Sequence, residues 1–273
     1  MVGDKVTNFY AAYDGHGGHT VSEYLAQHMH DHVAEHGGFI EDPLRCLRES
    51  FKSMDQLVLQ EHQSMPHSCG SCSTIFTVRP ETRKLYVAWC GDSRCVLSRN
   101  GKSVDLSTDH KPYVPSEVKR IEAAGGHVED NRVCGKLAVS RALGDYMMKD
   151  FKEEHPQLKR EGQKAPFTAD LVVSDADVSE TDWKDDDEFV LIASDGLWDK
   201  VSSQEAVTFV RDKLKTSNQL GRIAEALCDM AIDTRRTGDN CCVIIVMLKE
   251  PSFGDSKEEG GISVTAGDEE LNE

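Results

Sequence analysis

The spacing of apolar residues predicts helices near both ends of the chain and short strands between them. After residue 18, and again over residues 43–62, large side chains recur every three or four positions, as on one face of a helix. Short apolar runs joined by turn sequences fill the middle, a pattern typical of antiparallel strands. The predicted strands cover residues 9–13, 73–79, 84–89, 93–99, 102–106, 171–174, 188–193 and 241–246. The other predicted helices cover residues 115–124, 202–215 and 217–234. Helices before and after a block of strands indicate an α+β protein whose helices pack on the outer faces of sheets.

Local sequences mark the ends of several of these elements. Asn100-Gly101 lies between two strands and predicts a tight hairpin. Ser202 followed by Glu205 has the pattern of a capping box at a helix start, and Gly125-Gly126 predicts a helix end. The segment 148–166 is charged and poor in apolar residues, so we expect a mobile surface loop there.

The composition argues against several classes of partner. The 273 residues carry a formal net charge of −17, which disfavours binding to nucleic acid or to an anionic membrane. The chain has no apolar run of about 18 residues and no charged-then-apolar leader, so we expect neither a transmembrane span nor secretion. Nine cysteines without a leader suit a reducing compartment. We therefore expect a cytoplasmic or nuclear monomer with free thiols.

Charge also divides the chain into two parts. Residues 252–273 hold seven acids against one lysine and few large apolar residues, which predicts an acidic disordered tail over 251–273. Residues 1–250 hold all the predicted helices and strands, and we expect them to form one domain.

Three acidic residues stand at the ends of predicted strands. Asp14 follows strand 9–13, Asp195 follows strand 188–193, and Asp239 precedes the last strand. An isolated Asp-Gly pair is usually a plain turn, but three strand ends that each present a carboxylate suggest convergent side chains. Such a cluster would repel itself, and Mg²⁺ and Mn²⁺ prefer oxygen ligands. The sequence therefore predicts a divalent metal site.

Cysteine and histidine groups invite other metal or redox interpretations. Cys69 and Cys72 form a C-x-x-C pair, which is compatible with a redox dithiol or half of a zinc site. No second pair lies at zinc spacing, which favours plain packing. His28 and His32 lie four residues apart on a predicted helix, but no acidic residue completes a known metal pattern there. The other histidines of this group are His16, His19, His30 and His36.

With these residues in view, the sequence resembles the metal-dependent type 2C serine/threonine protein phosphatases of the PPM family over about residues 9–249. Six motifs occur in the family's order, from Asp14-Gly-His-Gly-Gly18 to Gly238-Asp239-Asn240. The four between them are Gly91-Asp92-Ser93-Arg94, Asp109-His110-Lys111-Pro112, Leu137-Ala-Val-Ser-Arg-Ala-Leu-Gly-Asp145 and Ser194-Asp-Gly-Leu-Trp-Asp199. One motif alone would be weak, whereas six in order are specific.

The resemblance implies a fold and a set of site residues. The fold would be a central sandwich of two antiparallel β-sheets flanked by helices on both sides, with the site between the sheets at one end. The groups that would hold two Mg²⁺ or Mn²⁺ ions, mostly through bridging waters, are Asp14, the carbonyl of Gly15, Asp195 and Asp239. Asp109 and Asp199 match positions that help to hold a third, weaker metal. His16 would be the general acid.

The implied activity is hydrolysis of phosphoserine and phosphothreonine in protein substrates by a metal-bridged water. Two cations about 3.5–4 Å apart can neutralise phosphate charge and lower the pKa of a shared water. A histidine titrates in the range needed to protonate the leaving alkoxide. No cysteine or serine nucleophile is required, so we expect no phosphoenzyme.

The sequence departs from the family before Asp14. The family's N-terminal strands supply an arginine that clamps the substrate phosphate and an acidic pair, and the 13 residues before Asp14 contain neither. We therefore expect an N-terminally truncated catalytic domain with weaker phosphate binding; Arg141 is a fallback contact, although a structural role suits it better. Two other hypotheses stay open: a catalytically impaired binding module with the phosphatase fold, and a metal-stabilised domain without phosphate chemistry.

Overall fold

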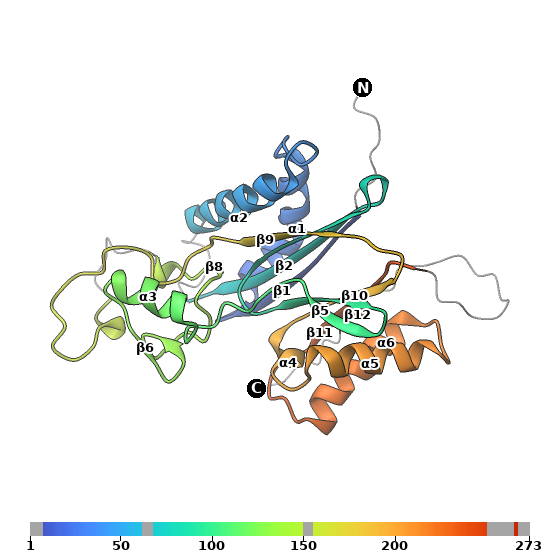
Figure 1. The fold of residues 1–273 in the computed structure, drawn as a ribbon. Coiled ribbons are helices and arrows are strands. Elements are labelled where there is room, and N and C mark those ends of the chain that lie inside the picture. Colours follow the sequence, from blue (N-terminus) through green and yellow to red (C-terminus); the bar gives the residue numbers. More distant parts are fainter. Residues whose placement is uncertain (1–7, 62–67, 150–154, 250–264, 267–273) are drawn as a thin grey trace.

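Two stacked antiparallel sheets form the centre of the molecule (Figure 1). The computed structural model describes residues 8–61, 68–149, 155–249 and 265–266. The first sheet has the order β1-β2-β3-β9, and a short β8 also pairs with β2. Its strands are β1 (Asn8–His16), β2 (Gly70–Arg79), β3 (Lys84–Cys90), β8 (Leu143–Gly144) and β9 (Asp177–Asp182).

The second sheet has the order β12-β11-β10-β4-β5. Its strands are β4 (Arg94–Arg99), β5 (Lys102–Asp105), β10 (Asp187–Ala193), β11 (Cys242–Met247) and β12 (Thr265–Ala266). The β4–β5 hairpin turns at Asn100 and Gly101, whose φ angles of 47° and 72° are both left-handed. Positive φ at both central residues is what a tight hairpin requires, so the hairpin predicted from the sequence is confirmed.

Helices cover the outer face of each sheet (Figure 1). The helices on the first sheet are α1 (Thr20–Glu35) and α2 (Pro43–Gln60), and those on the second are α5 (Ser203–Leu214) and α6 (Leu220–Asp229), which continues as a π-helical turn, Met230–Thr234. At the start of α5, the Ser202 hydroxyl accepts from the Glu205 amide and the Glu205 carboxylate accepts from the Ser202 amide, as the capping-box pattern predicted. The predicted α+β sandwich with helices on both sides is confirmed.

Alternating side chains on the strands supply three apolar layers. On β10, Phe189 and Leu191 face α5 and α6, while Val190 and Ile192 face the first sheet. On β2, Ile75 likewise packs with α1 and α2. Because both faces of the central strands are buried, strands such as β10 and β11 consist largely of continuous apolar runs.

A smaller lobe extends from one end of the sandwich (Figure 1). Its elements are α3 (Pro115–Ala123), the two-stranded ribbon of β6 (Val128–Glu129) and β7 (Arg132–Val133), and the 3-10 turns Tyr146–Met148 and Pro156–Leu158. Leu171 and Val172 are fully buried in the core of this lobe. The strand predicted at 171–174 is therefore wrong, since that apolar run packs in the lobe and forms only an isolated bridge between Val173 and Arg141.

The segment predicted as a mobile loop contributes to the same lobe. Met148 and Leu158 are buried in its core, so the segment is anchored by packing on both sides of residues 150–154. Residues 150–154 lie outside the described residues. The mobility of this loop stays a prediction.

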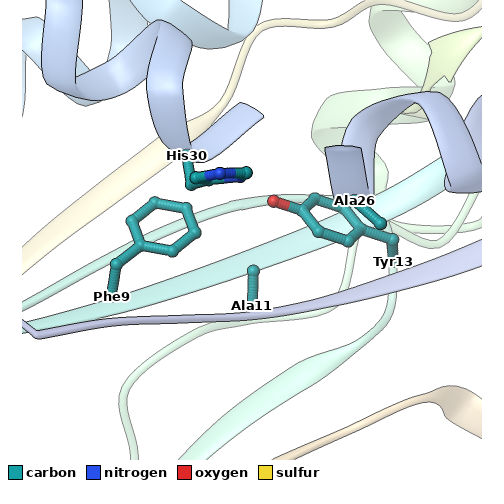
Figure 2. Close-up of a pocket in the computed structure, with 5 residues that line it drawn as sticks. All are labelled: Phe9, Ala11, Tyr13, Ala26 and His30. Atoms are coloured by element: carbon teal, nitrogen blue, oxygen red, sulfur yellow. The ribbon is translucent and has the colours of Figure 1, made fainter. Parts of the chain in front are cut away.

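β1 is an edge of the first sheet, because β2 is its only partner within the described ranges. Between β1 and α1 lies a hollow of about 440 Å³, lined by Phe9, Ala11, Tyr13, Ala26 and His30 (Figure 2). The three lining residues of β1 alternate along the strand and share one face, while Asp14 points to the opposite face. The hollow is therefore a gap beside the sheet edge, separate from the acidic site described below.

The edge position of β1 predicts uneven protection of backbone amides. Amides of β1 that point away from β2 are expected to exchange with deuterium about 100-fold or more faster than amides of β2, which is hydrogen-bonded on both sides. Native-state hydrogen exchange followed by NMR over residues 9–13 measures this difference. Equal protection of the two strands would contradict it and would indicate a further strand on β1.

Three further predictions concern the chain as a whole. Within the described ranges, no helix combines the length and apolar character needed to cross a membrane. All nine cysteines are free, and eight are buried. The predicted tail falls largely on 250–264 and 267–273, which lie outside the described residues, while Thr265–Ala266 pairs with β11. The disorder of this tail stays a prediction.

Candidate active site

Aspartates from both sheets interact at one end of the sandwich. Asp14 lies on β1, Asp92 lies in the turn between β3 and β4, and Asp195 begins α4 (Asp195–Trp198) directly after β10. The sequence placed Asp14 in a turn after its strand, but β1 continues to His16, and Asp14 pairs with Cys72 on β2. The ladder thus holds the backbone of Asp14 and of the exposed Gly15 in a fixed register.

The carboxylates of this cluster are partly desolvated and repel one another. Burial, followed by repulsion from Asp92 and Asp239, raises the pKa of Asp14 to about 6. Burial, with repulsion from Asp92 and Asp14, raises the pKa of Asp195 to about 7, although Lys111 opposes this shift. The cluster therefore carries more negative charge than its surroundings neutralise.

Lys111 supplies the positive charge in the cluster. Its Nζ donates to Asp92 Oδ2 at 2.6 Å and lies 3.4 Å from Asp195 Oδ2 and 3.6 Å from Asp199 Oδ1. Burial alone would lower the pKa of Lys111, but the carboxylates, Asp92 foremost, raise it. Asp92 is almost completely buried, and its Oδ1 accepts from the Cys72 thiol at 3.2 Å. One ammonium therefore serves three carboxylates.

The remaining predicted metal ligands, Asp239 and Asp109, differ in how they are placed relative to the carboxylates around Lys111. Asp239 acts on Asp14 electrostatically from the segment before β11, and its Oδ1 accepts from the Asn240 amide at 2.8 Å. Asp109 is engaged elsewhere, since its two oxygens accept from Arg94 at 2.9 and 2.7 Å. The structure thus brings Asp14, Asp195, Asp199 and Asp239 near one another and holds Asp109 in an ion pair beside them. The part of each in metal binding stays a prediction.

His16 lies beside the acidic cluster with its ring held by one partner. Its Nε2 lies 2.8 Å from Asp145 Oδ2, and its side chain is about a quarter exposed. Burial alone would lower the pKa of His16, but the hydrogen bond to Asp145 and the charges of Asp145, Asp14 and Asp92 together raise it above its ordinary value. The imidazolium form is therefore more favoured than in an isolated histidine, and this is the form that a proton donor needs.

The donor set of the cluster fits a hard divalent cation. Its donors are carboxylate oxygens, which Mg²⁺ and Mn²⁺ prefer, and its surplus negative charge is of the kind that a cation removes. In the described part of the chain, no three acidic, histidine or cysteine side chains already converge as ligands of one ion. Mg²⁺ commonly binds through one or two carboxylates and completes its shell with waters, so this arrangement is compatible with such an ion.

The sequence indicates no role for Asp92, Lys111 or Asp145, although all three lie within the six motifs. Asp92 lies between the predicted strands 84–89 and 93–99, directly before the second, and this position at a strand end was the signal that could have identified it. Lys111 and Asp145 sit in irregular segments, where spacing gives no such signal.

The structure also shows the contacts of the cysteines, the histidine and the arginine for which the sequence left other roles open. Cys69 and Cys72 are buried free thiols, which agrees with plain packing. His32 bonds the Ser53 hydroxyl at 2.7 Å between α1 and α2, as a structural histidine does. Arg141 donates to Glu117 at 2.6 Å and to Asp177 at 3.2 Å, so its guanidinium is occupied by internal ion pairs.

Comparisons with known proteins place this geometry in context. A family model described as protein phosphatase 2C matches residues 2–240. The chain is 37% identical over 262 residues to protein phosphatase 2C homolog 2 of Aspergillus fumigatus, covering 94% of this chain and 57% of that protein. It is 39% identical over 247 residues to protein phosphatase 2C homolog 3 of Schizosaccharomyces pombe, covering 88% and 56%. It is 30% identical over 310 residues to probable protein phosphatase 2C 21 of Arabidopsis thaliana, covering 94% and 83%. The chain thus spans little more than half the length of the two fungal relatives.

Solved structures share the fold. A sex-determining protein of C. elegans superposes with a TM-score of 0.75 at 24% identity, covering 90% of this chain and 57% of that chain. A serine-threonine phosphatase 2C of Toxoplasma gondii superposes with a TM-score of 0.72 at 19% identity, covering 91% and 87%. At these identities the likeness concerns the fold alone.

Proposed function

Because the chain belongs to the protein phosphatase 2C family, we propose that it hydrolyses phosphoserine and phosphothreonine in proteins and needs Mn²⁺ or Mg²⁺ to do so. The observation that carries this proposal is the surplus negative charge around Lys111, with the pKa of Asp14 raised to about 6 and that of Asp195 to about 7. A fold gains no stability from gathering mutually repelling carboxylates, so their assembly calls for a cationic ligand.

The residues of the cluster have separate tasks in this proposal. Two cations would be held by Asp14, the carbonyl of Gly15, Asp195 and Asp239. A third, weaker one would be held by Asp199 and by Asp109, whose oxygens also accept from Arg94. When bound, the cations neutralise phosphate charge and lower the pKa of a water molecule. Asp92 and Lys111 form the floor of the site, where the buried ion pair of 2.6 Å fixes both side chains.

His16 is proposed to protonate the leaving oxygen. Loss of a serine or threonine alkoxide is slow unless the oxygen receives a proton as the bond to phosphorus breaks. His16 is two residues from Asp14 on the same strand and is favoured in its protonated form by Asp145. Its place beside the acidic cluster therefore suits a proton donor to a phosphate bound there.

The test compares turnover of p-nitrophenyl phosphate and of a phosphothreonine peptide with Mn²⁺, with EDTA, and after Asp239→Ala. We expect EDTA to abolish turnover and Asp239→Ala to lower kcat/KM by about 10²- to 10³-fold, because a carboxylate that holds the cation is lost. Asp233→Ala, at an exposed acid of the π-helical turn Met230–Thr234 that precedes Asp239, is the matched control and should leave turnover unchanged.

Two results would count against the proposal. Turnover that is insensitive to EDTA would exclude the metal-dependent mechanism. A folded protein that binds Mn²⁺ in calorimetry but turns over neither substrate would instead favour the binding-module hypothesis.

A further inference from the structure

His16, Gly70 and Asp145 come together through three neighbouring strands. In the ladder of the first sheet, His16 of β1 pairs with Gly70 of β2, and Gly70 pairs on its other side with Gly144 of β8. Asp145 follows β8 directly, and its Oδ2 accepts a hydrogen bond from His16 Nε2 at 2.8 Å. The imidazole and the carboxylate therefore meet across the backbone of Gly70.

Gly70 leaves the space in which this hydrogen bond forms. A Cβ atom at position 70 would collide with both Asp145 Oδ2 and His16 Nε2. The backbone of Gly70 is not left-handed, so another residue could adopt its conformation. Only the contact between the two side chains demands a glycine here.

The backbone that carries Asp145 is fixed from two sides. The Asp145 amide donates to the Cys69 carbonyl at 2.9 Å, and the Gly144 amide donates to Asp55 Oδ1 at 2.8 Å. Asp55 lies on α2 and forms a buried ion pair of 2.7 Å with Lys149. Asp145 itself is buried and has a φ of 55°. The chain therefore holds it in a left-handed conformation that few residues other than glycine adopt. These contacts position one carboxylate accurately.

We propose that Asp145 is a positioning residue for His16. Its carboxylate orients the imidazole through the hydrogen bond to Nε2, which forms over the backbone of Gly70 because Gly70 has no side chain. This inference rests on the proposed function, in which His16 is the general acid. With Nε2–H retained by Asp145, Nδ1 is the nitrogen that gives its proton to the alkoxide oxygen as the phosphorus–oxygen bond breaks. The neutral ring then regains a proton on Nδ1 from water.

A second histidine–aspartate pair in the chain provides a matched control. His110 lies in the irregular segment that follows β5, and its Nε2 is 3.2 Å from Oδ2 of Asp177 on β9. Asp177 also accepts from Arg141. This pair does not involve His16. Substitution of Asp177 therefore removes the same type of contact without touching the proposed proton donor.

The test uses two substrates that differ in their need for a proton. The p-nitrophenolate leaving group is stable as an anion, whereas the threonine alkoxide is not. For the phosphothreonine peptide we expect Asp145→Asn and Gly70→Ala to lower kcat by about 10- to 100-fold with little change in KM, because the acid is misplaced. For p-nitrophenyl phosphate we expect a change of less than about 3-fold, because that step needs no acid. Asp177→Asn should leave the ratio of the two rates unchanged.

Two different variants, Asp145→Asn and Gly70→Ala, are used so that a loss of activity through misfolding can be distinguished from a misplaced acid. Asparagine tolerates the left-handed backbone of position 145, and Gly70→Ala alters neither the histidine nor the aspartate. Losses that are equal for both substrates, or no loss, would overturn the inference. Wild-type protein that turns over neither substrate with Mn²⁺ would instead overturn the proposed function.

A readout independent of turnover is the tautomer of the His16 ring, measured by long-range ¹H–¹⁵N NMR correlations. We expect the neutral wild-type ring to carry its hydrogen on Nε2 and both variants to lose this preference. An unchanged Nε2–H tautomer in both variants would also overturn the positioning role.

Discussion

Asp195→Asn is expected to lower metal-dependent kcat/KM by about 10³-fold or more while raising the stability of the metal-free protein. The loss of turnover follows because Asp195 is a predicted ligand from the second sheet. The gain in stability follows because asparagine removes one charge from a cluster in which burial, Asp92 and Asp14 raise the pKa of Asp195 to about 7. Opposite effects on turnover and stability are typical of residues kept for function.

The gain in stability should depend on pH in a definite direction. The pKa of Asp195 is raised from its ordinary value of 3.8 to about 7 in the folded protein, so the folded state binds a proton more readily than the unfolded chain does. Its contribution to stability is complete below about pH 4 and is lost as pH rises through about 7. Urea denaturation without metal should therefore show Asp195→Asn to be about 1–3 kcal/mol more stable than wild type at pH 8, with a smaller gain at pH 5.

The control for this prediction is Asp186→Asn, at an exposed acid beside β10. It should change neither turnover nor the pH dependence of unfolding. If Asp195→Asn lowered stability equally at pH 5 and pH 8, the charge cluster would have no part in the effect.

Lys111→Met is expected to destabilise the metal-free protein by about 3 kcal/mol or more at neutral pH. Asp92 is 1% exposed and its Oδ2 lies 2.6 Å from the ammonium, so the substitution leaves a buried carboxylate without its counter-charge. Mn²⁺ should restore part of this stability, since it supplies positive charge to the same carboxylates. Calorimetric titration should also show tighter Mn²⁺ binding, because the positive charge of the Lys111 ammonium no longer repels the metal ion.

Lys119→Met provides the comparison, because Lys119 is exposed on α3. It should unfold at the wild-type urea concentration with and without Mn²⁺. The prediction for Lys111 fails if Lys111→Met loses no stability, or if its deficit is the same in EDTA and in Mn²⁺.

The order of the main elements could be predicted from the sequence because most of them bury one or two apolar faces. β9 could not be, since its sequence Asp-Val-Ser-Glu-Thr-Asp is largely polar and only its pairing with β3 makes it a strand. Conversely, Leu171 and Val172 are buried by the lobe around α3, and an apolar run alone does not distinguish that environment from a strand. Both errors have one cause: tertiary contacts override local propensity.

Without the family resemblance, the residue pattern alone indicated the candidate site only at predicted strand ends. That rule identified Asp14, Asp195 and Asp239, and the structure brings their charges into interaction. The contacts of Lys111 with Asp92 and of Asp145 with His16 join residues 19 and 129 positions apart. Such pairings arise from strand order and register, which the sequence pattern alone does not specify.

The origin of the carboxylates on two separate sheets has a consequence for the cohesion of the molecule. Asp14 belongs to the first sheet and Asp195 follows a strand of the second, so their repulsion pushes the two sheets apart at this end. The layer between the sheets is mainly apolar, and apolar contacts have no preferred direction. A divalent cation shared by both residues would act as a removable cross-link, adding about 2.7 kcal/mol of stability at a concentration 100 times its dissociation constant. The metal content of the solution would then set how firmly the two halves of the sandwich are joined.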